Sequence, residues 1–152
     1  MSTIGVRESL LGRWDHLAVF QVDAISRKKL WFSPCYGWHG MLCYQADGAM
    51  YAVFSAVDRP AFGTEALDGG TQDEWARAYG SYISYSGKYT VDESEMVITH
   101  HVEFSTFPNW TGRDLVRHCR FSRDGEHLEL LTPSVHIGGM DITVQLDFRR
   151  SG

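Results

Sequence analysis

Hydrophobic and polar residues alternate along much of this chain, in short runs separated by Gly, Pro and Asp-Gly dipeptides. Alternation with a period of two is typical of strands that bury one face, and closely spaced turn residues are typical of an antiparallel meander. The stretch from Met140 to Arg149 shows the pattern most clearly, with an apolar residue at every second position. The pattern predicts eight strands, at residues 11–20, 41–45, 50–55, 82–91, 95–104, 113–122, 127–131 and 140–149.

Eight antiparallel strands are enough to close an up-and-down barrel, so the expected fold class is all-β. One short helix is expected within it, because Thr71 stands three residues before Glu74 in the arrangement of a capping box. This helix is expected to end near Gly80. With 152 residues, of which 43% are apolar, the chain is expected to form one domain over residues 1–152.

Composition and charge exclude several classes of partner. The net charge is −5 and the longest basic run is Arg27-Lys28-Lys29, so nucleic acid is not expected to bind. No stretch approaches the roughly 20 apolar residues that cross a bilayer, and no leader pattern opens the chain, so a cytoplasmic protein without membrane contact is expected. The chain has three cysteines, an odd number, and no C-x-x-C pair. This pattern predicts reduced thiols and no metal site. Without a phosphate-binding loop or a dinucleotide fingerprint, any chemistry is expected to need no cofactor.

A histidine and an arginine interrupt the apolar face of two neighbouring strands. His100 falls on the inward face of residues 95–104, and an unbulged antiparallel turn at residues 105–112 would place Arg117 opposite it. Because a buried guanidinium needs a counter-group, the pair predicts a cavity that holds an anionic or carbonyl-bearing ligand. Arg117 would stabilise an oxyanion, His100 would exchange a proton, and Tyr85 would donate a hydrogen bond. The alternative is structural: Arg117 extends to the barrel mouth and His100 donates to a core carbonyl.

Aromatic loops add candidates for ligand contact. Trp31 to His39 is rich in aromatic residues, and Phe107 and Trp110 flank Pro108 in a second such loop, so both are expected at the rim of a cavity unless they pack against the barrel end. The polar residues His101 and Asp114 belong to the outer face. The side chains expected to contact a ligand are Trp38, Tyr44, Phe54, Tyr89, Phe104, Phe107, Trp110, Leu115, Cys119, Met140 and Val144.

Several segments resemble those of bacterial and fungal lipocalin-like domain proteins. They are Leu11-Gly12-Arg13-Trp14, Gly40-Met41-Leu42-Cys43-Tyr44, Asp58-Arg59-Pro60, the run from Tyr82 to Tyr89, Thr99 to Glu103, and Phe107 to Gly112 with Val116-Arg117. The resemblance spans nearly the whole chain and implies a lipocalin-like barrel around a ligand cavity. It also implies that Trp14 packs at the closed barrel end beneath Arg149 or Arg150, and that His100 and Arg117 occupy polar positions of the lumen.

Taken together, these features predict a cofactor-free cyclase or isomerase that acts on a small hydrophobic biosynthetic intermediate, polyketide- or terpenoid-like, bound inside the barrel. The resemblance implies both enzymes of this kind and simple binders. A carrier that binds the same metabolite unchanged is the alternative function, and a barrel with a filled lumen that binds a macromolecule is a third. The sequence leaves open whether the chain forms a homodimer.

Overall fold

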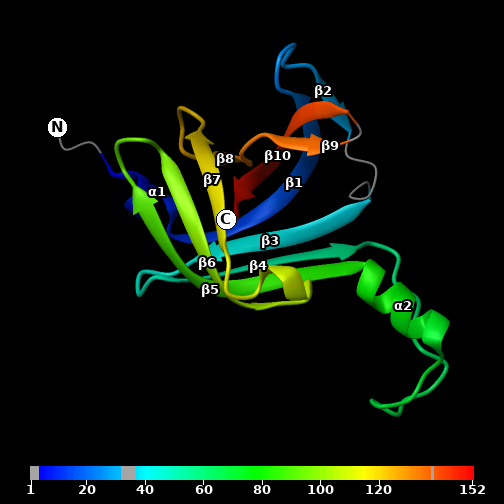
Figure 1. The fold of residues 1–152 in the computed structure, drawn as a ribbon. Helices are drawn as coiled ribbons and strands as arrows, with labels where there is room; N and C mark the ends of the chain where they lie inside the picture. Colours follow the sequence, from blue (N-terminus) through cyan, green and yellow to red (C-terminus); the bar gives the residue numbers. More distant parts are fainter. Residues whose placement is uncertain (1–3, 32–36, 138) are drawn as a thin grey trace.

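Eight antiparallel strands close into a barrel in the computed structural model, which describes residues 4–31, 37–137 and 139–152 (Figure 1). The eight predicted strands are the eight that form the ring, which confirms the expected fold class. Around the ring they are β1 (Gly12–Asp23), β3 (Trp38–Tyr44), β4 (Ala49–Ala56), β5 (Tyr82–Asp92), β6 (Val97–Ser105), β7 (Asp114–Phe121), β8 (His127–Leu131) and β10 (Met140–Arg150).

The first and last strands of the ring close it. β1 pairs with β10 from Trp14 opposite Arg150 to Asp23 opposite Ile142, the most extensive strand contact in the fold. Two short strands extend this seam: β2 (Lys29–Trp31) pairs with β1, and β9 (Val135–Ile137) pairs with β10. The sequence pattern did not predict these two strands, because each has only three residues.

Two bulges change which residues face inward. In β1, Leu17 is an extra residue, so Trp14 and His16 share the inner face with Val19 and not with Ala18. In β6, the register shifts opposite Ser86 and Gly87, which leaves Glu103 as the extra residue. A Cβ on Gly87 would collide with the backbone carbonyl of His101, so glycine is what permits this close approach.

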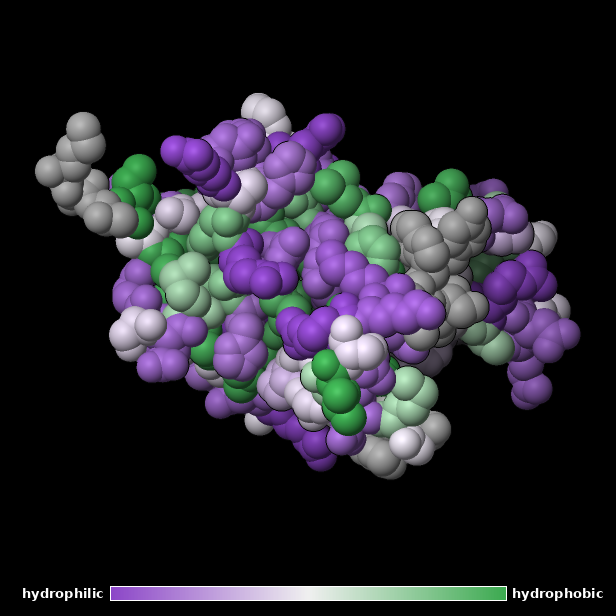
Figure 2. All heavy atoms as spheres, turned by 90° about the horizontal axis from the view of Figure 1, so that it is seen from above, coloured by the Kyte–Doolittle hydropathy of each residue, from purple (hydrophilic) through white to green (hydrophobic). Residues whose placement is uncertain are grey.

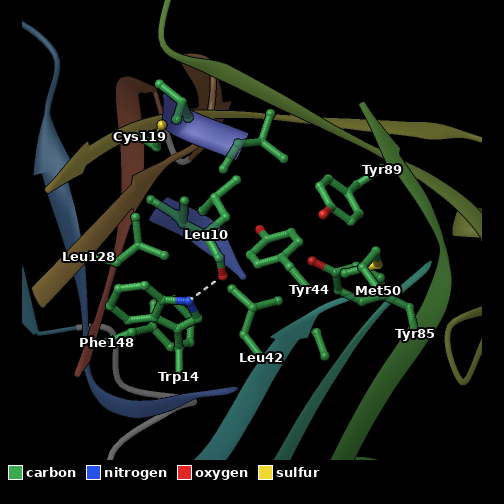
Figure 3. Packing of buried hydrophobic residues seen from close by; sticks show 14 of the residues in the cluster. Leu10, Trp14, Leu42, Tyr44, Met50, Tyr85, Tyr89, Cys119, Leu128 and Phe148 are labelled. Carbon is green, nitrogen blue, oxygen red and sulfur yellow. Dashed lines mark hydrogen bonds between the residues drawn. The ribbon is translucent and has the colours of Figure 1, made fainter. Parts of the chain in front are cut away.

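A five-residue helix fills one end of the barrel. α1 (Val6–Leu10) buries Leu10 completely, and the indole of Trp14 donates a 2.8 Å hydrogen bond to the Leu10 carbonyl (Figure 3). The Glu93 carboxylate accepts the backbone N–H groups of Val6 and Arg7 at the start of this helix. Charged side chains at helix ends satisfy backbone groups that the helix itself leaves unpaired.

Arg150 holds the other end of α1 and covers Trp14. Its guanidinium donates to the carbonyls of Ser9 and Leu11, and its central carbon lies 4.2 Å from the centroid of a Trp14 ring. The expected position of Trp14 at the closed end is therefore confirmed, with Arg150 as the arginine above it. Phe148 and Leu128 complete this end of the packed core (Figure 3).

α2 (Gln72–Gly80) projects away from the barrel, beyond the end of β4 and the start of β5 (Figure 1). The predicted capping box is present: the Thr71 hydroxyl accepts from the Glu74 backbone, and the Glu74 carboxylate accepts from the Thr71 backbone. A short 3-10 turn, η2 (Pro108–Trp110), joins β6 to β7.

Hydrophilic side chains cover much of the molecular surface seen from above, with hydrophobic ones in small groups between them (Figure 2). No helix among the described residues is long and apolar enough to cross a membrane.

Candidate functional site

A cavity of about 280 Å³ occupies the half of the barrel opposite α1. Its walls are mainly apolar, and every strand of the ring except β6 contributes a side chain to them. Binding cavities for small molecules commonly measure roughly 300–1,000 Å³, so this one suits a compact ligand. Six of the predicted site residues line it: Trp38, Phe54, Tyr85, Trp110, Arg117 and Val144.

His100 and Arg117 share a strand pair but are not opposite each other. His100 pairs with Leu115, and Arg117 pairs with Ile98, so the predicted register is wrong by two residues. A shift of two keeps both side chains on the inner face, because strand faces alternate with a period of two. The turn at residues 105–112 contains η2, and the Glu103 bulge precedes it, which accounts for the altered spacing.

The His100 ring lies between two tyrosine hydroxyls. The Tyr44 hydroxyl is 2.7 Å from Nε2 and the Tyr85 hydroxyl is 3.0 Å from Nδ1, and His100 is fully buried. Burial lowers the pKa of His100 well below its ordinary value, and the nearby positive charge of Arg117 lowers it further. The ring is therefore neutral at physiological pH, with one nitrogen that donates and one that accepts.

The direction of these hydrogen bonds follows from the surroundings of Tyr44. Its hydroxyl is buried and its one hydrogen-bond partner among the described residues is His100 Nε2, so the hydroxyl donates to that nitrogen. Nδ1 must then carry the proton and donate to the Tyr85 oxygen. This leaves the Tyr85 hydroxyl proton free to be donated toward the cavity that Tyr85 lines.

Arg117 contributes a positive charge to the same wall of the cavity. One guanidinium nitrogen donates to the Val116 carbonyl at 2.9 Å, and no carboxylate in the described part of the chain forms an ion pair with the group. Burial raises the pKa of Tyr85, and the charge of Arg117 and its hydrogen bond to the hydroxyl oppose that rise. Arg117 and Tyr85 thus form a pair of hydrogen-bond donors at one side of an apolar cavity.

The structure changes both interpretations of the His100–Arg117 pair, the ligand-binding one and the structural one. His100 does not line the cavity: both of its ring nitrogens are bonded to tyrosines, so it orients Tyr85 and has no nitrogen left for a ligand. The structural alternative, a bond from His100 to a core carbonyl, is also replaced by the two hydroxyl partners. Tyr85, which the sequence assigned an assisting role, is the group of this network that reaches the cavity.

Four other predicted contact residues lie in the packed core and not at the cavity. Tyr44, Tyr89 and Cys119 are almost completely buried, and Leu115 packs partly buried against them. Tyr89 donates to the Gln45 carbonyl, and Cys119 is only 2% exposed, with a thiol whose pKa burial raises to about 11. Neither side chain lines the cavity. The lumen is divided into a filled half and an open half, which alternation alone does not reveal.

Three more predicted contact residues face away from the cavity. Phe104 is 71% exposed, because the Glu103 bulge turns it to the outer surface. Met140 is 46% exposed, because it pairs with β9 beyond the residues that close the ring. Phe107 stands behind Trp110, edge-on at 5.4 Å between ring centroids, while Trp110 itself packs edge-on against Tyr85. Of the aromatic loop at Trp31 to His39, residues 32–36 lie outside the described residues.

His16 lines the cavity and was missed in the sequence. Its ring packs edge-on against Phe54 and Phe148, at 5.2 and 5.6 Å between centroids. Both ring nitrogens are buried and have no hydrogen-bond partner of good geometry in the described part of the chain. Burial lowers the pKa of His16, although the Ala18 backbone and the Asp147 charge offset part of this effect. The signal was present, because His16 is two residues from Trp14 and so shares its inward face.

The outer face behaves as the alternation predicts. The ring of His101 lies 2.7 Å from the Asp114 carboxylate and 2.9 Å from the Thr90 hydroxyl, both on the outside of the barrel. His101 therefore points away from His100, and the two neighbouring histidines do not share a site.

Comparison with known proteins agrees with the fold. The model of a lipocalin-like domain family matches residues 11–150. A relative, the 4'-hydroxy-3'-methoxypropiophenone carrier protein of Aspergillus oryzae, is 34% identical over 87 residues, an alignment that covers 53% of this chain and 78% of the relative. Since the family match extends over nearly the whole barrel, from β1 to the end of β10, this chain belongs to the lipocalin-like domain family.

Proposed function

We propose that this protein is a carrier that binds a small, largely apolar molecule with a carbonyl or other electron-rich oxygen in the open half of its barrel. The observation that carries the proposal is the half-buried Arg117 guanidinium, which lines an apolar cavity without an ion-pair partner among the described residues. A cation in such surroundings is costly unless an electron-rich group meets it. A ligand oxygen between Arg117 and Tyr85 would supply that group.

The size of the cavity and the name of the relative narrow the ligand class. A volume of about 280 Å³ suits one aromatic ring with short substituents better than a long lipid chain. The relative is named as the carrier of 4'-hydroxy-3'-methoxypropiophenone, an aryl ketone of that size. By analogy, the ketone oxygen of an aryl ketone would accept from Arg117 and Tyr85, and the ring would lie among Phe54, Trp38 and Trp110.

Binding can be measured with that aryl ketone as the probe. Because Trp38 and Trp110 line the cavity, occupancy should change tryptophan fluorescence, and calorimetry gives the affinity independently. Arg117→Met should weaken binding about tenfold or more, since a hydrogen bond to a charged donor is worth about 1.5–3 kcal/mol. Tyr85→Phe should weaken it by a smaller factor.

Arg120→Met is the matched control, because Arg120 lies on the outer face of the same strand and pairs with Glu129. Its affinity for the probe should equal that of the wild type. The carrier proposal fails if the probe does not bind, or if Arg117→Met binds it as tightly as the wild type does.

Cofactor-free isomerisation or cyclisation is the second candidate function, favoured by the same two donors. Where a ketone enolises, negative charge develops on the oxygen, and Arg117 with Tyr85 would stabilise it. The proton lost from the carbon beside the ketone would pass to water in the cavity and return when the ketone re-forms, while Tyr85 keeps its own proton in the hydrogen bond to the oxygen. NMR in D₂O distinguishes the two functions: a carrier returns the probe unchanged, whereas an isomerase accelerates deuterium exchange beside the ketone and loses this effect in Arg117→Met.

A further inference from the structure

A second polar group faces the cavity from the other side of the barrel. β1 is three strands from β5 around the ring in one direction and three strands from β7 in the other. His16 on β1 therefore faces Tyr85 and Arg117 across the lumen, and all three residues line the same cavity. The cavity has donors at one wall and an imidazole at the opposite wall.

The surroundings of His16 do not explain why a histidine is there. Its neighbours Phe54 and Phe148 are aromatic, and its nitrogens make no hydrogen bond of good geometry within the described residues. A buried polar group without a partner is a cost that an apolar ring of the same shape would avoid. Residues that lower stability in this way cluster at binding and catalytic sites.

We infer that His16 is a specificity-determining residue that binds a hydroxyl group at the end of the ligand opposite Arg117. The inference rests on the proposed carrier function and narrows its ligand class to aromatic molecules with a phenol at one end and a ketone at the other. Both ring nitrogens are buried in this structure, so this binding requires rotation of the imidazole about its last side-chain bond, a torsion that is broad for histidine. The neutral ring both donates and accepts, so it can pair with a hydroxyl in either direction.

Two ligands that differ in one oxygen test the inference. The wild type should bind 4'-hydroxypropiophenone about five- to tenfold more tightly than propiophenone, which lacks the phenol, because a single buried hydrogen bond has that effect. In His16→Phe this preference should fall to less than twofold, while propiophenone binds with similar affinity. His118→Phe makes the same chemical change on the outer surface and should keep the full preference.

Stability gives an independent readout. Without ligand, His16→Phe should unfold at the same urea concentration as the wild type or at a higher one, because it removes two buried nitrogens that make no hydrogen bond of good geometry within the described residues. The loss of the contact with the Ala18 backbone offsets only part of this gain. His16→Leu is a second variant in case the phenyl ring does not fit. An unchanged preference for the phenol in both variants overturns the role of His16, as does a wild type that binds both ketones equally. Failure of the wild type to bind either ketone overturns the carrier function itself, and the His16 role with it.

Discussion

The hydrogen bond from Tyr44 to His100 provides the sharpest test of how the polar core is built. Tyr44→Phe removes one oxygen and leaves the Nε2 atom of a fully buried imidazole without a partner. An unpaired buried acceptor costs about 1–3 kcal/mol, so the free energy of unfolding should fall by that amount. Tyr85→Phe should cost less, because Tyr85 lines the cavity and water there can take the place of its hydroxyl.

Urea unfolding followed by tryptophan fluorescence and by far-UV circular dichroism measures both effects. The slope of the transition should stay the same, since neither variant alters how much surface is exposed on unfolding. Tyr79→Phe deletes the same atom on the exposed face of α2 and should stay within about 0.5 kcal/mol of the wild type. If Tyr44→Phe is as stable as this control, the deduced bond from Tyr44 to Nε2 is wrong.

Three further outcomes follow from the structure. The pKa values of His100 and His16 are both lowered in the folded state, so the unfolded chain binds more protons below about pH 6.5. Stability should therefore be full above that pH and fall below it, by up to about 1.4 kcal/mol per pH unit for each of the two histidines. Gly87→Ala should cost about 3 kcal/mol or more, measured by urea unfolding, because its Cβ would collide with the His101 carbonyl. Arg150→Ala should cost about 2–3 kcal/mol and increase hydrogen exchange in α1, because it removes two hydrogen bonds and the contact with Trp14.

Each outcome has its own control. The pH effect should be measured between pH 5 and 6.5, above the range where carboxylates titrate, and a flat profile there contradicts the neutral buried state of His100. Gly80→Ala, at the exposed end of α2 with open space around it, should be neutral or mildly stabilising. Arg149→Ala removes an exposed neighbour of Arg150 and should change stability by less than about 0.5 kcal/mol. A loss equal to that of Arg150→Ala would indicate a general charge effect.

Alternation identified every strand of the ring, because each has one face toward the core. It could not locate the bulges, since one extra residue leaves almost no local trace and reverses every position beyond it, as Phe104 shows. The local sequence pattern also did not predict the helix α1. Its N-cap, Gly5, offers no side chain, and the helix is held by Glu93 and Arg150 from distant strands.

For the site, the chemistry was easier to predict than the contacts. Polar residues on an apolar face stood out, and Tyr85 and Arg117 do line the cavity. Whether a lumen residue faces the cavity or the packed core depends on how far along the barrel it lies, which the sequence pattern does not encode. His100 shows the consequence: it was assigned direct contact with a ligand, whereas it lies behind Tyr85.

The pairing of β1 with β10 has a consequence for how the chain folds. The strands between them pair with their neighbours along the sequence, but β1 finds its longest partner only in β10, the last strand of the ring. Contacts between such distant residues slow folding, and until β10 is in place, one edge of β1 and one edge of β8 present unpaired backbone groups. A chain cut before residue 140 would keep those edges open, and they would favour association between chains over closure of the barrel.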